Sequence, residues 1–168
     1  THRVAVITKR QLQDGSSSWA QGGIAAVLAD DDSFEAHIQD TLVAGAGLCD
    51  LATTRFVVEN APASIAWLRA LGVPFTLEGE HLHLTREGGH SARRIAHVTD
   101  ATGAAVQRTL IDVVRGTPGI TLFEHHTLID LITSQKLGLA GQRCLGLYAL
   151  DEATDQVITF RAPQTILA

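Results

Sequence analysis

The sequence predicts an α/β fold in which a parallel sheet is joined to an antiparallel strand meander. The apolar segment Val4–Thr8 alternates too little for a surface strand and suits a parallel strand buried on both faces. A helix over residues 102–115 breaks at the turn 116–119 before a strand at 120–123, which is a helix-to-parallel-strand step. The short apolar segments that follow are separated by turn residues, as in a meander.

Residues 10–23 are expected to form a loop, and helices are expected to follow. Ser33 caps the first helix, which the glycines at 45 and 47 end, and Asp50 caps the second. Pro62 restarts a further helix that Gly72 terminates, and Thr102 caps the last one. Their apolar residues are expected in the core: Phe34, Ile38, Leu42, Val43, Leu51, Phe56, Val57, Val58, Ile65, Trp67, Leu68, Leu71, Ala105, Val106, Leu110, Ile111 and Val114.

Strands are predicted on both sides of the last helix. Apolar residues alternate about Glu78-Gly-Glu80, which favours a hairpin within residues 73–84 that holds the loop after it. The meander is expected to have strands at 128–133, 144–150, 157–160 and 165–167, with turns at 137–138, 141 and 151–155.

Composition excludes several classes of function. The 168 residues are 45% hydrophobic and 18% charged, which is enough to bury one core. The net charge of −5, with acids and bases interspersed, argues against a nucleic-acid partner. No apolar run approaches the roughly 18 residues of a transmembrane helix, and the N-terminal residues lack the charged-then-apolar pattern of a signal peptide, so a cytoplasmic location is expected.

The sequence offers little for a metal or a disulfide. Cys49 and Cys144 are far apart, without a Cys-x-x-Cys pattern, and are expected to be buried thiols. His81 and His83 share one strand face without a third ligand nearby, so no metal site is predicted.

Two segments carry residues suited to binding chemistry. Residues 15–24 (Gly-Ser-Ser-Ser-Trp-Ala-Gln-Gly-Gly-Ile) combine hydroxyls with paired glycines after the first strand, which lets backbone N–H groups approach a phosphate or a flat ring. Residues 85–91 (Thr-Arg-Glu-Gly-Gly-His-Ser) place a base, an acid, a flexible Gly-Gly and a His-Ser pair in one loop. Such a loop could grip a small charged substrate.

The sequences of these segments, and their order along the chain, resemble one flavoprotein family. It is the family of L-aspartate oxidase and the flavoprotein subunits of succinate dehydrogenase and fumarate reductase. The aspartate oxidase branch is the nearest. The resemblance runs nearly end to end, through Val6-Ile-Thr-Lys9, residues 20–27, 40–47, 83–91, 93–97 and Asp100-Ala-Thr-Gly103. It implies a Rossmann-like FAD domain with two dinucleotide-binding parts, of which residues 1–168 are a segment incomplete at both ends. The first Gly-x-Gly-x-x-Gly turn and most of the capping domain would lie outside it.

The resemblance also implies which residues bind the cofactor. Lys9 follows the second strand of the implied dinucleotide fold, and Thr127 and Leu128 begin a strand against the adenosine half of the flavin. The stretch Ser16, Ser17, Ser18, Trp19, Ala20, Gln21, Gly22 and Gly23 matches the flavin-binding turn. Ser16 stands where relatives with covalent flavin have histidine, so the FAD is expected to be noncovalent.

The insertion 73–100 is expected to face the substrate. Glu87 stands where the dicarboxylate dehydrogenases have phenylalanine, and an acid there would pair with the ammonium of L-aspartate and repel succinate. The alternative is that Glu87 only pairs with Arg86 or Arg93 on the surface. Two interpretations stay open for His90, Ser91 and Arg86, which either orient substrate or are structural, and Arg93 and Arg94 are interpreted as solvated charges at a helix edge.

The implied reaction is oxidation of L-aspartate to iminoaspartate, with dioxygen or fumarate as acceptor, in the pathway from aspartate to NAD. Quinolinate synthase would be the partner, and the acid/base group would lie elsewhere in the protein. Two alternatives stay open. One is a flavoprotein that handles succinate or fumarate, which Ser16 and Glu87 oppose. The other is a segment that is inactive when isolated.

Overall fold

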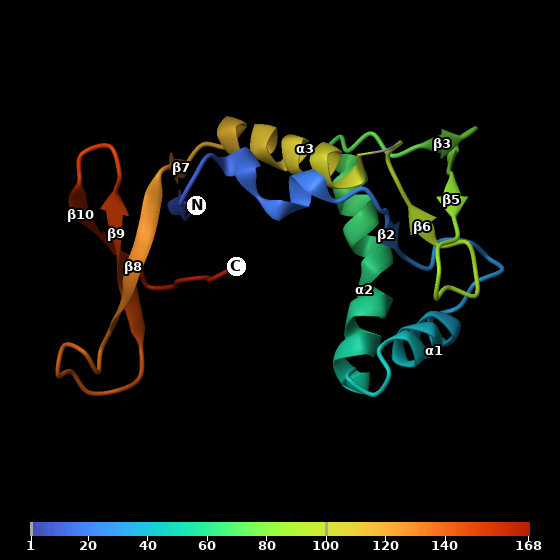
Figure 1. Ribbon diagram of the computed structural model, residues 1–168, viewed down its shortest axis with the longest axis horizontal. Coiled ribbons are helices and arrows are strands. Elements are labelled where there is room, and N and C mark those ends of the chain that lie inside the picture. The colour runs from blue at the N-terminus through green and yellow to red at the C-terminus, as the bar shows by residue number, and fades with distance from the viewer. Residues whose placement is uncertain (1, 100) are drawn as a thin grey trace. The chain divides into compact units, whose positions relative to one another are not determined.

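The computed structural model describes residues 2–99 and 101–168, which form two compact units (Figure 1). Among the described residues, the strand unit comprises 2–14 and 114–168, and the helical unit comprises 15–99 and 101–113. Residue 100 lies outside the described residues. It is the last residue of the predicted insertion 73–100 and the first of the motif that ends at Gly103. Both a parallel strand pair and an antiparallel meander are present, so the predicted α/β class is confirmed.

The strand unit begins with a parallel pair. β1 (Val4–Ile7) runs beside β7 (Ile120–Phe123), with Val4 opposite Ile120. The prediction that this first strand is buried on both faces is wrong, since Val4 is 44% exposed. Among the described residues β7 is the one strand that pairs with β1, which leaves part of its surface uncovered.

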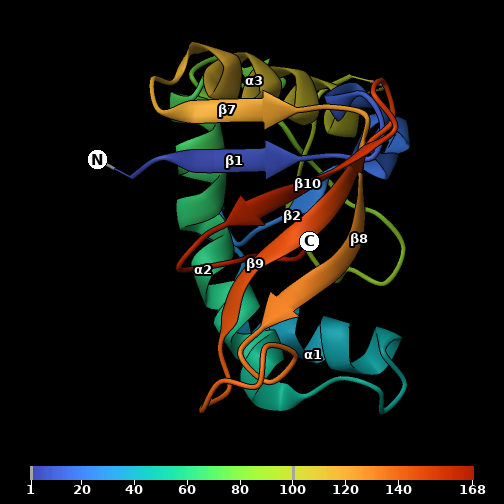
Figure 2. The ribbon, with the colours of Figure 1, turned by 90° about the vertical axis from the view of Figure 1, so that its left-hand side faces the viewer.

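An antiparallel meander forms the rest of the strand unit (Figure 2). β8 (His126–Thr133), β9 (Cys144–Asp151) and β10 (Gln156–Arg161) lie in the order β10-β9-β8. The predicted fourth strand at 165–167 is wrong. Ala162 makes the last bond of this ladder, from its N–H to the Leu145 carbonyl, and Pro163 has no N–H with which to continue.

The helical unit contains α1 (Phe34–Ala44), α2 (Leu51–Ala70) and most of α3 (Thr102–Gly116). Two predicted caps are confirmed: the Ser33 hydroxyl accepts from the Ala36 N–H at 3.2 Å, and Asp50 accepts from the Thr53 N–H at 2.8 Å. Each satisfies a backbone donor that has no partner within the helix. Thr102 does not act as predicted, because its hydroxyl instead bonds the N–H and carbonyl of Val98.

Pro62 does not start a new helix, because α2 continues through it. A proline removes one backbone bond from the helix interior. Residues on both sides of Pro62 belong to one buried stripe of α2, and the packing of this stripe outweighs the lost hydrogen bond. The stripe consists of Thr54, Val58, Ile65 and Leu68. Gly72 ends the helix as predicted. Gly72 has a φ of +101° and donates its N–H to the Arg69 carbonyl, and the N–H of Val73 donates to the Leu68 carbonyl. These two hydrogen bonds form a Schellman motif.

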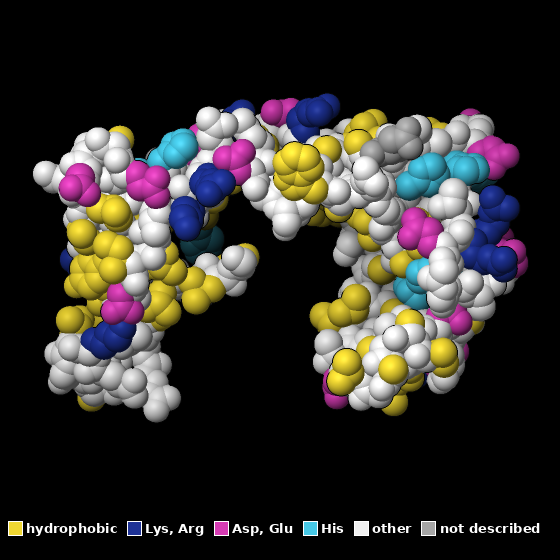
Figure 3. All heavy atoms as spheres, viewed as in Figure 1, with side chains coloured by type: hydrophobic (Ala, Val, Ile, Leu, Met, Phe, Trp, Pro, Cys, Tyr) yellow, Lys and Arg dark blue, Asp and Glu magenta, His cyan; other side chains and the backbone are white. Residues whose placement is uncertain are grey.

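The core of the helical unit joins α2 to short strands. It is built from Ala26, Ile65, Leu68, Val73, Phe75 and Ala96, with Val106 and Leu110 of α3 packed against it. Several helix residues expected in the core lie off the buried stripe and are instead 39% to 78% exposed. They are Phe34, Val43, Leu51, Phe56, Val57 and Trp67. Hydrophobic side chains are visible at the surface around α1 and the start of α2 (Figure 3).

Short strands pack beside these helices. β3 (Leu77–Glu78) and β4 (His81–Leu82) form the predicted hairpin, which turns at Gly79. Unpredicted strands β2 (Ile24–Ala25), β5 (Leu84–Thr85) and β6 (Ile95–Ala96) form a second small sheet in the order β2-β6-β5. Residues 86–94, here called the β5–β6 loop, are therefore held at both ends by strand pairing.

Three smaller features complete the fold. The expected loop at 10–23 contains two short 3-10 helices, η1 (Leu12–Asp14) and η2 (Ser16–Trp19). Cys49 and Cys144 are free thiols but only half-buried, which corrects the expectation of burial. Among residues 2–99 and 101–168, no helix is long and apolar enough to cross a membrane.

Candidate functional site

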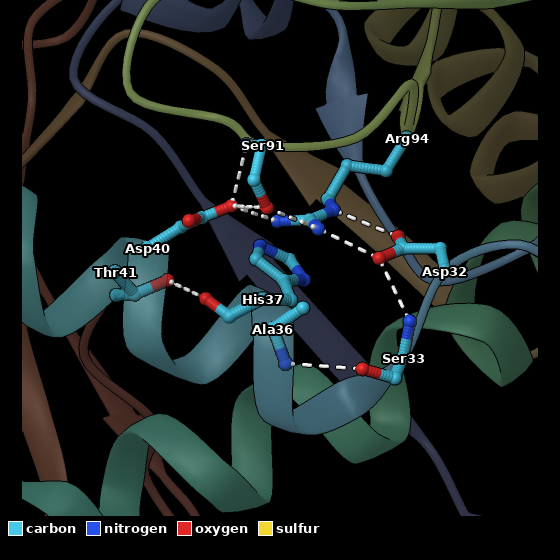
Figure 4. A network of polar contacts seen from close by, with 8 residues as sticks. All are labelled: Asp32, Ser33, Ala36, His37, Asp40, Thr41, Ser91 and Arg94. Carbon is cyan, nitrogen blue, oxygen red and sulfur yellow. Dashed lines mark hydrogen bonds and ion pairs between the residues drawn. The ribbon is translucent and has the colours of Figure 1, made fainter.

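A buried arginine anchors the β5–β6 loop (Figure 4). Arg94 is fully buried, donating from Nε and Nη2 to Asp32 at 2.8 and 2.6 Å and from Nη1 to Asp40 at 2.6 Å. Asp32 precedes α1 and Asp40 lies on it, so the arginine ties the end of the loop to this helix. The expectation that Arg94 is a solvated charge is wrong, because the two carboxylates supply the partners that a buried guanidinium needs.

These contacts set the charge state of the two acids. Burial by itself would raise the pKa of Asp40, but hydrogen bonds from Ser91 and Arg94 outweigh it and lower that pKa from 3.8 to about 2. Burial would likewise raise the pKa of Asp32, and the bonds from Arg94 and the Ser33 N–H lower it. Both acids are therefore ionised at neutral pH, as the buried cation requires.

Ser91 and His90 lie at this anchor. Ser91 donates from its backbone N–H and from its hydroxyl to Asp40 Oδ2, both at 2.7 Å. The His90 ring lies 5.6 Å from the ring of His37, whose pKa is lowered by burial and by the nearby Arg94. The structure thus places both predicted residues against α1, where they help to fix the loop.

The predicted flavin-binding stretch packs on the start of α3. The Ser18 hydroxyl donates to Gln107, and the Gly103 N–H donates to the Ala20 carbonyl at 3.0 Å. A Cβ on Gly103 would lie 1.9 Å from the Ser17 carbonyl oxygen, so only glycine permits this approach. The stretch is thereby fixed while Ser16, Ser17 and Trp19 stay exposed, and Trp19 is 83% exposed.

The two glycines of the stretch have different surroundings. A Cβ on Gly23 would lie 2.4 Å from Ile95 Cγ2 and 2.5 Å from the Ala96 carbonyl oxygen, so Gly23 is required for packing on β6. A Cβ on Gly22 would meet only the Glu87 carboxylate, at 3.8 Å. Gly22 therefore presents accessible backbone toward Glu87.

A cavity of about 390 Å³ brings together the two segments singled out in the sequence. Gln21 and Gly23 come from the first segment, while Thr85 and Glu87 come from the second. His97 and Val98 complete the lining. We call this the Glu87 cavity. Among the described residues Glu87 makes no ion pair with Arg86 or Arg93, and the Arg93 Nε donates to the Leu84 carbonyl instead.

Sequence reasoning missed a histidine pair beside this cavity. His83 Nδ1 and His97 Nε2 are 3.0 Å apart, and the two rings meet edge to face with centroids 5.3 Å apart. The pair follows from the β5–β6 register, in which Leu84 lies opposite Ala96 and the next residues therefore face each other. The histidine pair could have been found from the sequence only if the pairing of β5 with β6, and its register, had been predicted.

The remaining predicted cofactor residues lie in the strand unit. Lys9 is exposed and lies two residues after the end of β1. Thr127 and Leu128 lie in β8, where the Thr127 hydroxyl donates to Glu152 and Leu128 is 42% exposed.

The helical unit has features that suit a flavin. Backbone at 15–17 and 21–22 is exposed, and glycines permit close approach there, as a phosphate or a flat ring requires. The whole chain, residues 1–168, matches the family described as FAD binding domain. The chain belongs to this FAD-binding domain family. FAD, the predicted cofactor, is confirmed by this membership.

Similar proteins refine the position within the family. The chain is 59% identical over 169 residues to L-aspartate oxidase 1 of Ralstonia nicotianae and 51% identical over 174 residues to L-aspartate oxidase of Pseudomonas aeruginosa. Each match covers 99% of this chain and 32% of the relative, so the chain spans about a third of their length. A quinol fumarate reductase structure from E. coli is 27% identical with a TM-score of 0.88, covering 96% of this chain and 27% of that one. The predicted resemblance to L-aspartate oxidase is confirmed.

Proposed function

We propose that this FAD-binding domain is part of an L-aspartate oxidase, in which it holds FAD noncovalently and selects the substrate through Glu87. The observation that carries the proposal is the Glu87 cavity. Its lining includes the carboxylate of Glu87 and the backbone turn at Gln21 and Gly23, which matches the flavin-binding turn of the family. The high identity to proteins named L-aspartate oxidase supports the same reaction.

The proposed chemistry divides between the cofactor and the protein. FAD, when bound, supplies the acceptor for the hydride that leaves Cα of L-aspartate, and the product is iminoaspartate. Dioxygen, which would give hydrogen peroxide, or fumarate would serve as the electron acceptor. Residues 16–23 would hold the isoalloxazine side of the cofactor. Lys9, Thr127 and Leu128 would contact its adenosine half.

Glu87 would choose between substrates by charge. Its carboxylate would pair with the ammonium of L-aspartate, whereas succinate has no ammonium to offer and adds only like charge. Glu87 is exposed in this chain, so apposed like charges would cost several kcal/mol only where bound FAD and substrate exclude water from the cavity. Since about 1.4 kcal/mol is a factor of ten, one residue can separate the two substrates by about 100-fold or more.

His90 and Ser91 would act by position. Their contacts with α1 fix the far half of the β5–β6 loop. We therefore assign them a supporting role rather than contact with substrate. The reaction would belong to the cytoplasmic pathway from aspartate to NAD, with quinolinate synthase as the consumer of the product.

Anaerobic flavin bleaching tests this proposal in the whole protein that contains the chain. L-aspartate is added to one sample and succinate to another while the oxidised-flavin absorbance is followed. The wild type should be bleached by L-aspartate. Glu87→Phe should lose about 100-fold or more of the aspartate rate and gain dicarboxylate activity, whereas Glu80→Gln, at the exposed hairpin turn, should leave both rates unchanged.

The outcomes separate the candidate functions. Bleaching of the wild type by succinate alone would place the protein with the dicarboxylate dehydrogenases. Aspartate turnover that survives Glu87→Phe unchanged would remove the selecting role of Glu87 while leaving the oxidase activity in place. If the isolated chain fails to retain FAD while the whole protein retains it, the chain alone is an inactive segment.

A further inference from the structure

We propose that His97 accepts the proton that the substrate ammonium must lose, and that His83 passes a proton on to solvent. This inference rests on the proposed function, because oxidation at Cα needs the neutral amine. His97 lines the Glu87 cavity together with Glu87, Thr85 and Gln21. An amine held by Glu87 would thus share its cavity with an imidazole.

Backbone contacts fix the two histidines in place. A single residue, Thr76, donates its N–H to the His97 carbonyl at 2.8 Å and accepts the His83 N–H at 2.9 Å. The neighbouring pair Leu84 and Ala96 belongs to the β5–β6 ladder. Both rings are therefore attached to paired backbone, which is the rigid support that proton transfer over a hydrogen bond requires.

The pair can move one proton without gaining net charge. In one tautomer His97 Nε2–H donates to His83 Nδ1, so that His97 Nδ1 carries a lone pair and His83 Nε2 carries a proton. A proton arriving at His97 Nδ1 lets the Nε2 proton cross to His83 Nδ1, and the His83 Nε2 proton leaves to solvent. One proton enters and one leaves, and the hydrogen bond is re-formed in the opposite sense.

The rest of the step balances with the reaction already proposed. The ammonium loses one proton to His97 and becomes a neutral amine. Its nitrogen lone pair then forms the C=N bond as the Cα hydrogen leaves with its electron pair to the flavin. Glu87 keeps its charge and orients the nitrogen throughout. Two titratable groups accompany His97: His83, just before β5, contacts its ring at 3.0 Å, and Glu87 lines the same cavity.

Chemical rescue tests the inference in the FAD-loaded whole protein. His97→Ala should slow flavin reduction by L-aspartate about 100-fold or more at unchanged FAD content, since general-base catalysis is typically worth 10²- to 10⁴-fold. Added imidazole should restore at least about a tenth of the rate. His97→Gln, which keeps a hydrogen-bonding side chain but cannot relay a proton, should be equally slow. His81→Ala, an exposed histidine on β4, should match the wild type with or without imidazole.

A second readout does not depend on turnover. Nitrogen NMR of histidine-labelled protein, with and without FAD, should show the proton shared by His83 and His97. That signal should vanish in His83→Ala and persist in His81→Ala.

The outcomes distinguish this inference from the function on which it rests. If L-aspartate bleaches the wild type but His97→Ala reacts equally fast, the proton role is wrong and the oxidase stands. If His97→Ala is slow and imidazole fails to rescue it, the pair only packs the strands and the inference is overturned. If L-aspartate does not bleach the wild type, both the function and the inference fall.

Discussion

Replacing Arg94 with methionine should release the β5–β6 loop from α1. The side chain is fully buried, and it makes three hydrogen bonds to two carboxylates at 2.6 to 2.8 Å. Methionine preserves much of the volume but leaves the acids without their cation. Removing one partner of a buried ion pair costs about 3–5 kcal/mol, because an uncompensated charge remains in the interior.

The cost should fall mainly on Asp32. The pKa of Asp40, lowered from 3.8 to about 2, corresponds to about 2.4 kcal/mol in favour of its ionised form. Hydrogen bonds from Ser91 contribute more to that shift than Arg94 does, and they survive the substitution. Asp32 is only 1% exposed and depends on the arginine, so Asp32→Asn added to Arg94→Met should recover a large part of the loss.

Hydrogen exchange can measure this effect locally. The Arg94 N–H donates to the Thr85 carbonyl and the Ala26 N–H donates to the Arg94 carbonyl, so both amides report on the anchored loop. At about 1.4 kcal/mol per factor of ten, Arg94→Met should speed exchange in peptides covering residues 84–97 by about 100-fold to several thousand-fold. Exchange in the middle of α2 should change much less.

The neighbouring arginine provides the matched control. Arg93 is exposed, and its Nε reaches the Leu84 carbonyl, so Arg93→Met should change exchange by less than about fivefold, as for a typical surface substitution. Equal exchange in the Arg93 and Arg94 variants would refute the view that the buried ion pairs hold the loop.

Two further predictions concern the anchor and the flavin-binding stretch. Because the folded-state pKa of Asp40 lies below its unfolded value, its stabilisation is fully present above pH 3.8 and is lost as the pH falls towards about 2. The free energy of unfolding, measured by urea titration, should therefore fall over that range in the wild type and fall less steeply in Asp40→Asn. Gly103→Ala should weaken FAD retention about tenfold or more, because its Cβ would force the Ser17 backbone aside, whereas Gly116→Ala, which meets nothing within 4 Å, should keep the FAD-to-protein absorbance ratio of the wild type.

Features set by local chemistry could be predicted from the sequence. Ser33 and Asp50 cap helices because their side-chain oxygens reach backbone N–H groups only three residues ahead. Gly72 ends α2 because it adopts a positive φ without strain. Each of these depends on a few neighbouring residues, which the sequence contains in full.

Features set by distant partners could not be predicted in the same way. Pro62 remains inside a helix because the stripe on both sides of it is buried against other elements. Arg94 is buried because Asp32 and Asp40, more than fifty residues earlier, meet it from two sides. The sequence next to Arg94 shows only a second arginine, Arg93, and no acid, so it favours two solvated charges over a buried ion pair.

The candidate site was predictable in its parts but not in its arrangement. Glu87 and the Gln21-Gly22-Gly23 turn could be singled out by residue type and by resemblance, yet their shared cavity depends on Gly23 packing against β6. The pairing of His97 with His83 carried no signal, although both lie in segments that carry the resemblance, since strands of two residues are too short for hydrophobic alternation to specify their register. Selection by charge needs Glu87 to be held still, because a mobile carboxylate could turn away from succinate at little cost. The strand pairing at β5 and the Arg94 anchor at the other end of the loop together provide that restraint, which links the buried ion pairs to the choice of substrate. If Glu87 selects the substrate as proposed, Arg94→Met should narrow the preference of the whole protein for L-aspartate over succinate even though Arg94 does not line the cavity.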